Sequence, residues 1–144
     1  VLSGVFRLPW TLTLAPVYEY GSGQPWTKRI GYDYNGDGYN SDRPTGVGRN
    51  TEKGPKFSQL SLRLMKHVKA GQRVGFDVIA ECFNVFNTKN DNVASLVDSG
   101  NGAMFLSGPT LANQKLPTVV NPNFGKYTAT LSPREAQLGL RLTF

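Results

Sequence analysis

The stretch "REAQLGLRLTF", from Arg134 to Phe144, ends the chain, and it alternates strictly between apolar and other side chains. Its apolar positions are Ala136, Leu138, Leu140, Leu142 and Phe144. Successive side chains of a β-strand point to opposite faces, so a period of two predicts a strand with one apolar face. Chain ends are usually polar and frayed. This end is instead patterned throughout, and the question is what covers its leucines.

The same alternation recurs upstream and predicts a sheet. The expected strands are residues 10–20 ("WTLTLAPVYEY"), 57–68 ("FSQLSLRLMKHV"), 73–87 ("RVGFDVIAECFNVFN") and 134–144. A short turn at Lys69–Gln72 would join the middle two into an antiparallel hairpin. The opening "VLSGVF" predicts the tail of a further strand, with a tight turn at Arg7–Pro9. Pro16 cannot donate to a ladder, so it predicts a bulge or break.

Two long connections separate these strands. Residues 21–56 and 88–133 are rich in Gly, Asn and Pro, as loops are, with a possible short helix at 110–116. The connections run short, long, short, long, as in outer-membrane barrels with short turns on one side and long loops outside. The expected fold is all-β, an antiparallel meander of about four to five long strands. No run of about 18 apolar residues predicts a transmembrane helix.

Composition limits the partners. The chain has 16 Lys and Arg against 10 Asp and Glu, a formal charge of +6. This surplus suits anionic lipid or lipopolysaccharide, whereas the cations are too scattered for a nucleic-acid footprint, so no nucleic acid is expected. Cys82 is the only cysteine, which excludes an internal disulfide.

A membrane barrel would explain the patterned end. Its outward side chains must be apolar and its inward ones polar, because one side meets lipid and the other an aqueous interior. Leu138, Leu140 and Leu142 would face lipid, with Phe144 in an interfacial aromatic girdle. Trp10, Tyr18, Tyr20 and Trp26 would be belt residues or ordinary strand core. The expected lumen-facing charges are Arg63, Asp77, Glu81 and Arg141.

The segment "DYNGDGYNSD", Asp33 to Asp42, is a candidate calcium loop. Asp33, Asn35 and Asp37 occupy positions 1, 3 and 5 of such a loop, and Gly38 occupies position 6. The carbonyl of Tyr39 could supply position 7, and Asp42 could substitute in part for the missing bidentate Glu, since position 12 is Pro44. The alternative is a turn stabilised by Asx hydrogen bonds that binds nothing. No cofactor other than calcium is expected.

No catalytic constellation is recognisable, so no enzyme is expected. His67 has no second His or Cys nearby for a metal site. Asp77 and Glu81 are four residues apart on a strand, about 13 Å at ~3.3 Å per residue, too far for paired-carboxylate glycosidase chemistry.

Several phrases resemble the C-terminal end of TonB-dependent outer-membrane receptors, and most closely the Oar-like branch, whose members often carry a carboxypeptidase-regulatory-like domain. The similar phrases are "YEYGSGQPW" (18–26), "DYNGDGYNSDRPTGVGRN" (33–50), "FSQLSLRLMKHV" (57–68), "ECFNVFN" (81–87) and "LGLRLTF" (138–144). The last resembles the insertion signal that the barrel-assembly machinery reads, which implicates Leu138, Leu140, Leu142 and Phe144. Together the phrases span most of the chain.

The resemblance implies that residues 1–144 are the C-terminal part of a 22-stranded transmembrane β-barrel, without its plug domain. The whole protein would be an outer-membrane receptor for TonB-coupled uptake of a large solute, and its partners would be lipid, lipopolysaccharide, the rest of the barrel and plug, and the TonB complex. Residues 21–56 and 88–133 would be extracellular, with 69–72 and 7–9 periplasmic. The alternative is a soluble extracellular β-sandwich that binds calcium and a glycan or protein.

Overall fold

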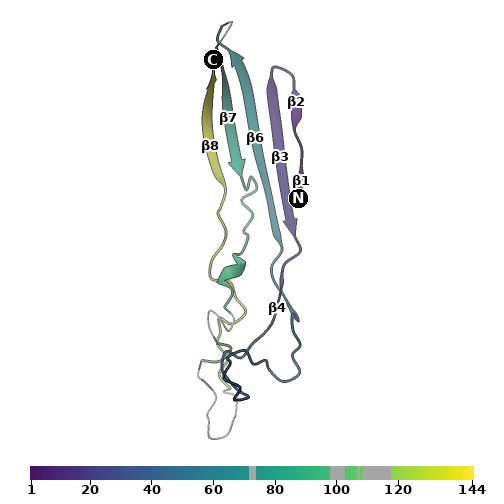
Figure 1. Ribbon diagram of the computed structural model, residues 1–144, viewed down its shortest axis with the longest axis vertical. Coiled ribbons are helices and arrows are strands. Elements are labelled where there is room, and N and C mark those ends of the chain that lie inside the picture. The colour runs from purple at the N-terminus through teal and green to yellow at the C-terminus, as the bar shows by residue number, and fades with distance from the viewer. Residues whose placement is uncertain (72–73, 98–102, 107, 109–117) are drawn as a thin grey trace. The chain divides into compact units, whose positions relative to one another are not determined.

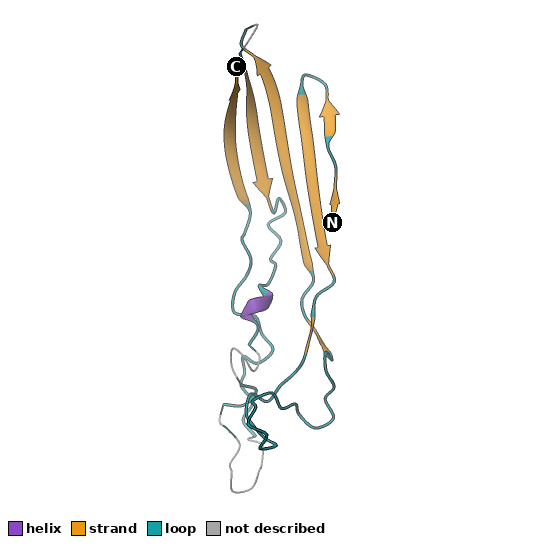
Figure 2. Ribbon diagram, viewed as in Figure 1, coloured by secondary structure: helices purple, strands orange, loops and turns teal. Residues whose placement is uncertain are grey.

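The computed structural model describes residues 1–71, 74–97, 103–106, 108 and 118–144, and it shows an all-β protein (Figures 1 and 2). The chain forms two compact units. The sheet unit comprises residues 1–22, 56–90 and 132–144, and the loop unit comprises residues 23–55 and 91–131. The expected short helix at 110–116 lies outside the described residues. Within the described part, no helix is both long and apolar enough to cross a bilayer.

The sheet unit is an antiparallel meander of six strands in the order β1-β3-β6-β7-β8, with β2 also paired to β3 (Figure 1). The strands are β1 (Leu2–Ser3), β2 (Phe6–Leu8), β3 (Leu12–Gly21), β6 (Phe57–Lys69), β7 (Gly75–Phe83) and β8 (Glu135–Thr143). The end of β6, the start of β7 and the end of β8 lie at one end of the sheet, beside the turn between β2 and β3. The prediction of long antiparallel strands is confirmed, with changed bounds.

The break near Pro16 lies in the neighbouring strand, between β1 and β2, and not in β3, which contains Pro16. β3 runs through Pro16 without a break, and Pro16 pairs with Leu62 of β6. Its other side faces the first strands, where its carbonyl accepts a hydrogen bond from the Gly4 amide at 3.3 Å. β1 and β2 pair with β3 in the same register on either side of Gly4–Val5. We attribute the gap between them to the N–H that proline lacks.

The first turn lies later than expected. Trp10 and Thr11 both have positive φ, at 61° and 60°, and the Leu12 amide bonds to the Pro9 carbonyl. This is the left-handed geometry that suits tight hairpins. The strand therefore begins at Leu12, not Trp10, and Trp10 is a turn residue with 79% of its surface exposed.

The connection between β6 and β7 is longer than the four residues expected. Lys69 pairs with Gly75, and Val68 pairs with Phe76. Pairing Val68 with residue 73, as a four-residue turn requires, would bring even positions opposite odd ones. A shift of one residue moves every side chain to the other face, so the apolar sets of the two strands would no longer match. Residues 72 and 73 lie outside the described part.

β7 ends at Phe83, four residues before the expected end, because Asn84 adopts a left-handed conformation (φ 49°). Asn84 is buried, and its side chain accepts from the Thr88 amide at 2.9 Å and donates to the Thr88 carbonyl at 3.0 Å. Asn87, also left-handed, accepts from the Arg134 amide just before β8. The "FNVFN" phrase thus ends one strand and fixes the entry of the next.

The loop unit contains little regular structure but has an apolar centre. Its elements are the ribbon of β4 (Pro25–Trp26) and β5 (Glu52–Lys53) and the 3₁₀ helix η1 (Val93–Ser95). The buried hydrophobic residues among those described are Ile30, Leu96 and Val97, and all lie in this unit. Trp26 packs edge-on against Phe124, with ring centroids 6.1 Å apart, so it is not a residue of the large sheet. Burial raises the pKa of Tyr127, and the nearby charge of Asp91 adds to the effect.

Candidate functional site

The register of the sheet divides its side chains into two chemically different faces. Every cross-strand pair joins an even-numbered residue to an even-numbered one, or odd to odd. Cross-strand partners share a face, so each face runs unbroken across the strands. The even face carries mainly leucine, valine, alanine, phenylalanine and tyrosine, and the odd face carries most of the charged and polar residues. We call them the apolar face and the polar face.

The apolar face is open. Leu138, Leu140 and Leu142 are 84%, 72% and 60% exposed, and Leu64 and Val78 are also exposed. Phe144, just beyond the strand, is 95% exposed. An uncovered apolar surface spanning several strands is unusual for a protein in water. The residues expected to form the outward stripe therefore do lie on one face, and no described part of the sheet unit covers them.

Two further features of the apolar face are a lysine and a hollow. Lys66 is the one charged residue at the even positions of the strands in the sheet unit, all of which the structure describes, and it lies three residues from the end of β6. A lysine so placed can extend its ammonium beyond the apolar surface. Cys82 lies opposite Ala136, and these small residues line a hollow of about 730 Å³ with Leu62, Leu64 and Leu138.

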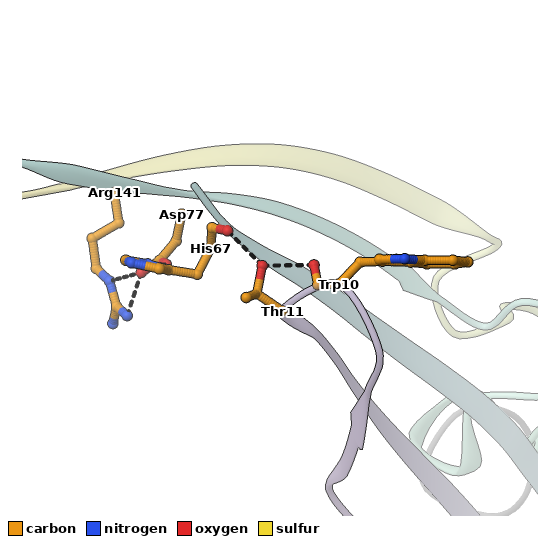
Figure 3. A network of polar contacts seen from close by, with 5 residues as sticks. All are labelled: Trp10, Thr11, His67, Asp77 and Arg141. Atoms are coloured by element: carbon orange, nitrogen blue, oxygen red, sulfur yellow. Dashed lines mark hydrogen bonds and ion pairs between the residues drawn. The ribbon is translucent and has the colours of Figure 1, made fainter. Parts of the chain in front are cut away.

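One charged cluster on the polar face spans three strands in a single row. His67 pairs with Asp77, which in turn pairs with Arg141 (Figure 3). The Asp77 carboxylate is buried and accepts from Arg141 through Nε at 2.9 Å and Nη2 at 2.5 Å, while its other oxygen lies 2.7 Å from His67 Nδ1. Thr11 donates its hydroxyl to the His67 carbonyl at 2.7 Å and so ties the first turn to this row.

A second row repeats the arrangement four residues away. Glu81 of β7 lies between Arg63 of β6, at 3.4 Å from its Nε, and Gln137 of β8, whose amide donates to it at 2.5 Å. Each row thus has a carboxylate on the central strand between donors on both neighbours. Met65, Ile79 and Gly139 form the apolar row between them. Such cross-strand pairs stabilise one register of the sheet over slipped ones.

The four expected charges do share the polar face, and the structure joins them as two pairs, Arg63 with Glu81 and Asp77 with Arg141. Two partners were missed from the sequence, His67 and Gln137. Only the strand register could have identified them. When even-numbered residues pair with even-numbered residues and odd with odd, His67 can lie opposite Asp77, and Gln137 can lie opposite Glu81. His67 is therefore a hydrogen-bond partner of Asp77 rather than an isolated residue.

The Asp33–Asp42 loop is held by its own carboxylates. Asp33 accepts from the amides of Gly36, Asp37 and Gly38, at 2.7 to 3.1 Å. Asp42 accepts from the amides of Tyr34 and Asn35, and Asp37 accepts from the amide of Tyr39. These are Asx-type bonds. They order the loop without a cation and leave calcium binding as a prediction.

The described residues contain no group of three or more His, Cys, Asp or Glu that could hold a metal ion. Comparison with family models, with curated proteins and with solved structures gave no match for this chain. Among the described residues, the two chemically different faces of the sheet therefore bear most directly on function.

Proposed function

We propose that the sheet is part of the wall of a transmembrane β-barrel, with the apolar face against lipid and the polar face toward a water-filled interior. The observation that carries the proposal is the exposure of Leu138, Leu140 and Leu142, on the same face as the apolar residues of the neighbouring strands. Hydrocarbon is a natural environment for such a surface, and it also favours strands that alternate along their length.

The dimensions of the apolar face support this proposal. In β3 the apolar face runs from Leu12 to Tyr20, a stretch of nine residues, and a tilted β-strand needs ~9–11 residues to cross a bilayer. An outer-membrane barrel presents an apolar band ~25 Å tall, flanked by aromatic girdles. Exposed aromatics lie toward both ends of the sheet: Trp10 and Phe144 at one, and Tyr18 and Tyr20 toward the other.

The particular barrel that we propose is a 22-stranded TonB-dependent receptor of the Oar-like branch in the bacterial outer membrane. It would import a large solute with energy relayed by the TonB complex and would make or break no bond. The wall segment would join the remaining strands and enclose a plug, and the barrel-assembly machinery would read Leu138 to Phe144. The loop unit would lie outside the cell, beside lipopolysaccharide. The support is the run of motifs, together with the two-faced sheet.

A soluble calcium-binding β-sandwich ranks second. It needs a second sheet layer on the leucines of β8, and their exposure favours the barrel over it.

Spin labelling tests the membrane assignment. Single cysteines would replace residues 137 to 142 in turn, in a full-length Cys82→Ala chain reconstituted into lipid vesicles. Labels at 138, 140 and 142 should be accessible to oxygen and shielded from a water-soluble nickel complex, while labels at 137, 139 and 141 should show the opposite. Equal access of the nickel complex to both sets would exclude the proposal.

Transport is tested separately, in the cells that make the protein. Loss of its gene should abolish uptake of a large solute to the same extent as loss of TonB, and small solutes that diffuse through porins should be unaffected. If the uptake of every large solute is unchanged, the proposed role in TonB-coupled transport is wrong.

A further inference from the structure

Arginine side chains gather around one hollow of the loop unit. The hollow has a volume of about 550 Å³, and Arg29, Arg43 and Arg49 line it together with Thr27, Ser41 and Asp42. All of these residues belong to the first segment of the loop unit, so the hollow depends on no contact with the sheet. We propose that it binds a phosphate-bearing anion. The proposal does not rest on the receptor assignment.

Hydrogen bonds within the segment bring the three arginines together. The Ile30 amide donates a hydrogen bond to the Asp42 carbonyl at 2.7 Å. This bond holds the two loop segments that carry Arg29 and Arg43 next to each other. The Asn50 amide bonds to the Thr27 hydroxyl at 2.9 Å and draws Arg49 to the same side. A turn from Pro44 to Val47 closes the path between them. Gly46 takes φ 80° at its third position, where glycine is favoured.

The positive charge of the hollow is only partly balanced by the residues that the structure describes. In the part of the chain that the structure describes, none of the three guanidinium groups has a carboxylate partner or a hydrogen bond. Three other cations do have carboxylate partners: Lys28 pairs with Glu52, and Arg63 and Arg141 pair across the sheet. Asp42 is the acidic residue of the lining, and one of its carboxylate oxygens already accepts two backbone amides. Three positive charges thus face one negative charge that is engaged elsewhere.

Guanidinium chemistry selects the ligand. Each guanidinium offers a planar fork of N–H donors that matches two oxygens of a phosphate or carboxylate. A single carboxylate is satisfied by one such fork, whereas a phosphate group presents three oxygens and up to two charges and can engage several. The Ser41 hydroxyl adds a donor of the kind found at phosphate sites. The phosphate could come from a soluble phosphorylated solute or from the headgroup of a lipid.

Binding of pyrophosphate by the full chain tests the site. Isothermal titration would be done in non-ionic detergent at physiological salt, with the native chain and the variants R29Q, R43Q and R49Q. We expect each substitution to weaken binding about tenfold, since a charge-assisted hydrogen bond contributes roughly that factor. Lys126→Gln is the matched control, because Lys126 is an exposed cation of the same unit that does not line the hollow.

A second arm separates the two sources of phosphate. The same proteins would be titrated with vesicles containing phosphatidic acid and with vesicles of phosphatidylcholine alone. Arginine-dependent binding of pyrophosphate supports a soluble ligand, and arginine-dependent binding of phosphatidic acid vesicles alone supports a lipid headgroup. If neither probe binds, or if Lys126→Gln weakens binding as much as the arginine variants do, the proposal is overturned.

Discussion

The two units of this protein bury opposite kinds of side chain. The loop unit places Ile30, Leu96 and Val97 inside, as proteins in water do. The sheet unit instead buries Asp77, Asn84 and Asn90 and exposes the leucines of β8. Buried polar groups are tolerated there because each has hydrogen-bond partners. This difference is the one expected if the sheet faces lipid, as proposed, and the loop unit faces water, and it can be tested by making the same change in both units.

The largest effect is expected from placing a charge on the apolar face. Leu140→Arg should destabilise the chain in lipid vesicles by about 2–4 kcal/mol, the range for arginine near the midplane of a membrane barrel. Leu106→Arg is the matched change in the loop unit, at a leucine 62% exposed, and it should alter stability by less than about 0.5 kcal/mol. Urea unfolding in vesicles measures both. Equal, small effects would mean that the exposed leucines of the sheet also face water.

Removing an apolar side chain should instead destabilise the loop unit more than the sheet unit. Ile30→Ala should destabilise the loop unit by about 2 kcal/mol, at the low end for buried isoleucine because a loop can partly close a cavity. Leu138→Ala should cost only about 0.5 kcal/mol, since leucine contributes little more than that in a bilayer. Hydrogen exchange of the Ile30 and Met104 amides, both in hydrogen bonds at this centre, reports on the loop unit. Comparable losses at both sites would contradict the comparison.

The buried asparagine at the end of β7 should matter more than an exposed one. Asn84→Ala should cost about 1–2 kcal/mol, because it leaves the Thr88 amide and carbonyl without their partner. Asn84→Gly retains access to positive φ and separates the backbone preference from the hydrogen bonds. Asn40→Ala, at an exposed site in the loop unit, serves as the control. Thermal unfolding measures all three. An Asn84→Ala chain as stable as the control would show that the hydrogen bonds between Asn84 and Thr88 contribute little to stability.

The smallest effect is expected from calcium. At ~5 mM Ca²⁺, a site with a dissociation constant near 1 mM would stabilise the Asp33–Asp42 loop by about 1 kcal/mol. The loop should then resist proteolysis more than it does in Mg²⁺, and Asp33→Asn should abolish the difference. If Ca²⁺ changes neither proteolysis nor heat flow, the carboxylates serve only the amides that they accept from in the structure.

Much of the site could be anticipated from local pattern. The assignment of Leu138, Leu140 and Leu142 to one face, and of Arg63, Asp77, Glu81 and Arg141 to another, needed only the period of two. The pairs among those charges could not be anticipated, because each joins residues that are 18 to 64 positions apart in the chain. The arginines of the hollow follow no regular spacing in the sequence. They come together only because hydrogen bonds join the three loop segments that carry them.

The sequence by itself determined the long strands, their two faces and the long connections, because alternation and turn residues act over a few neighbouring positions. Only the tertiary structure decided the register that opposes His67 to Asp77, the early end of β7 at Asn84, and the gap opposite Pro16. These depend on backbone groups of distant strands meeting in space, where one missing N–H or one left-handed residue determines which partner is within reach.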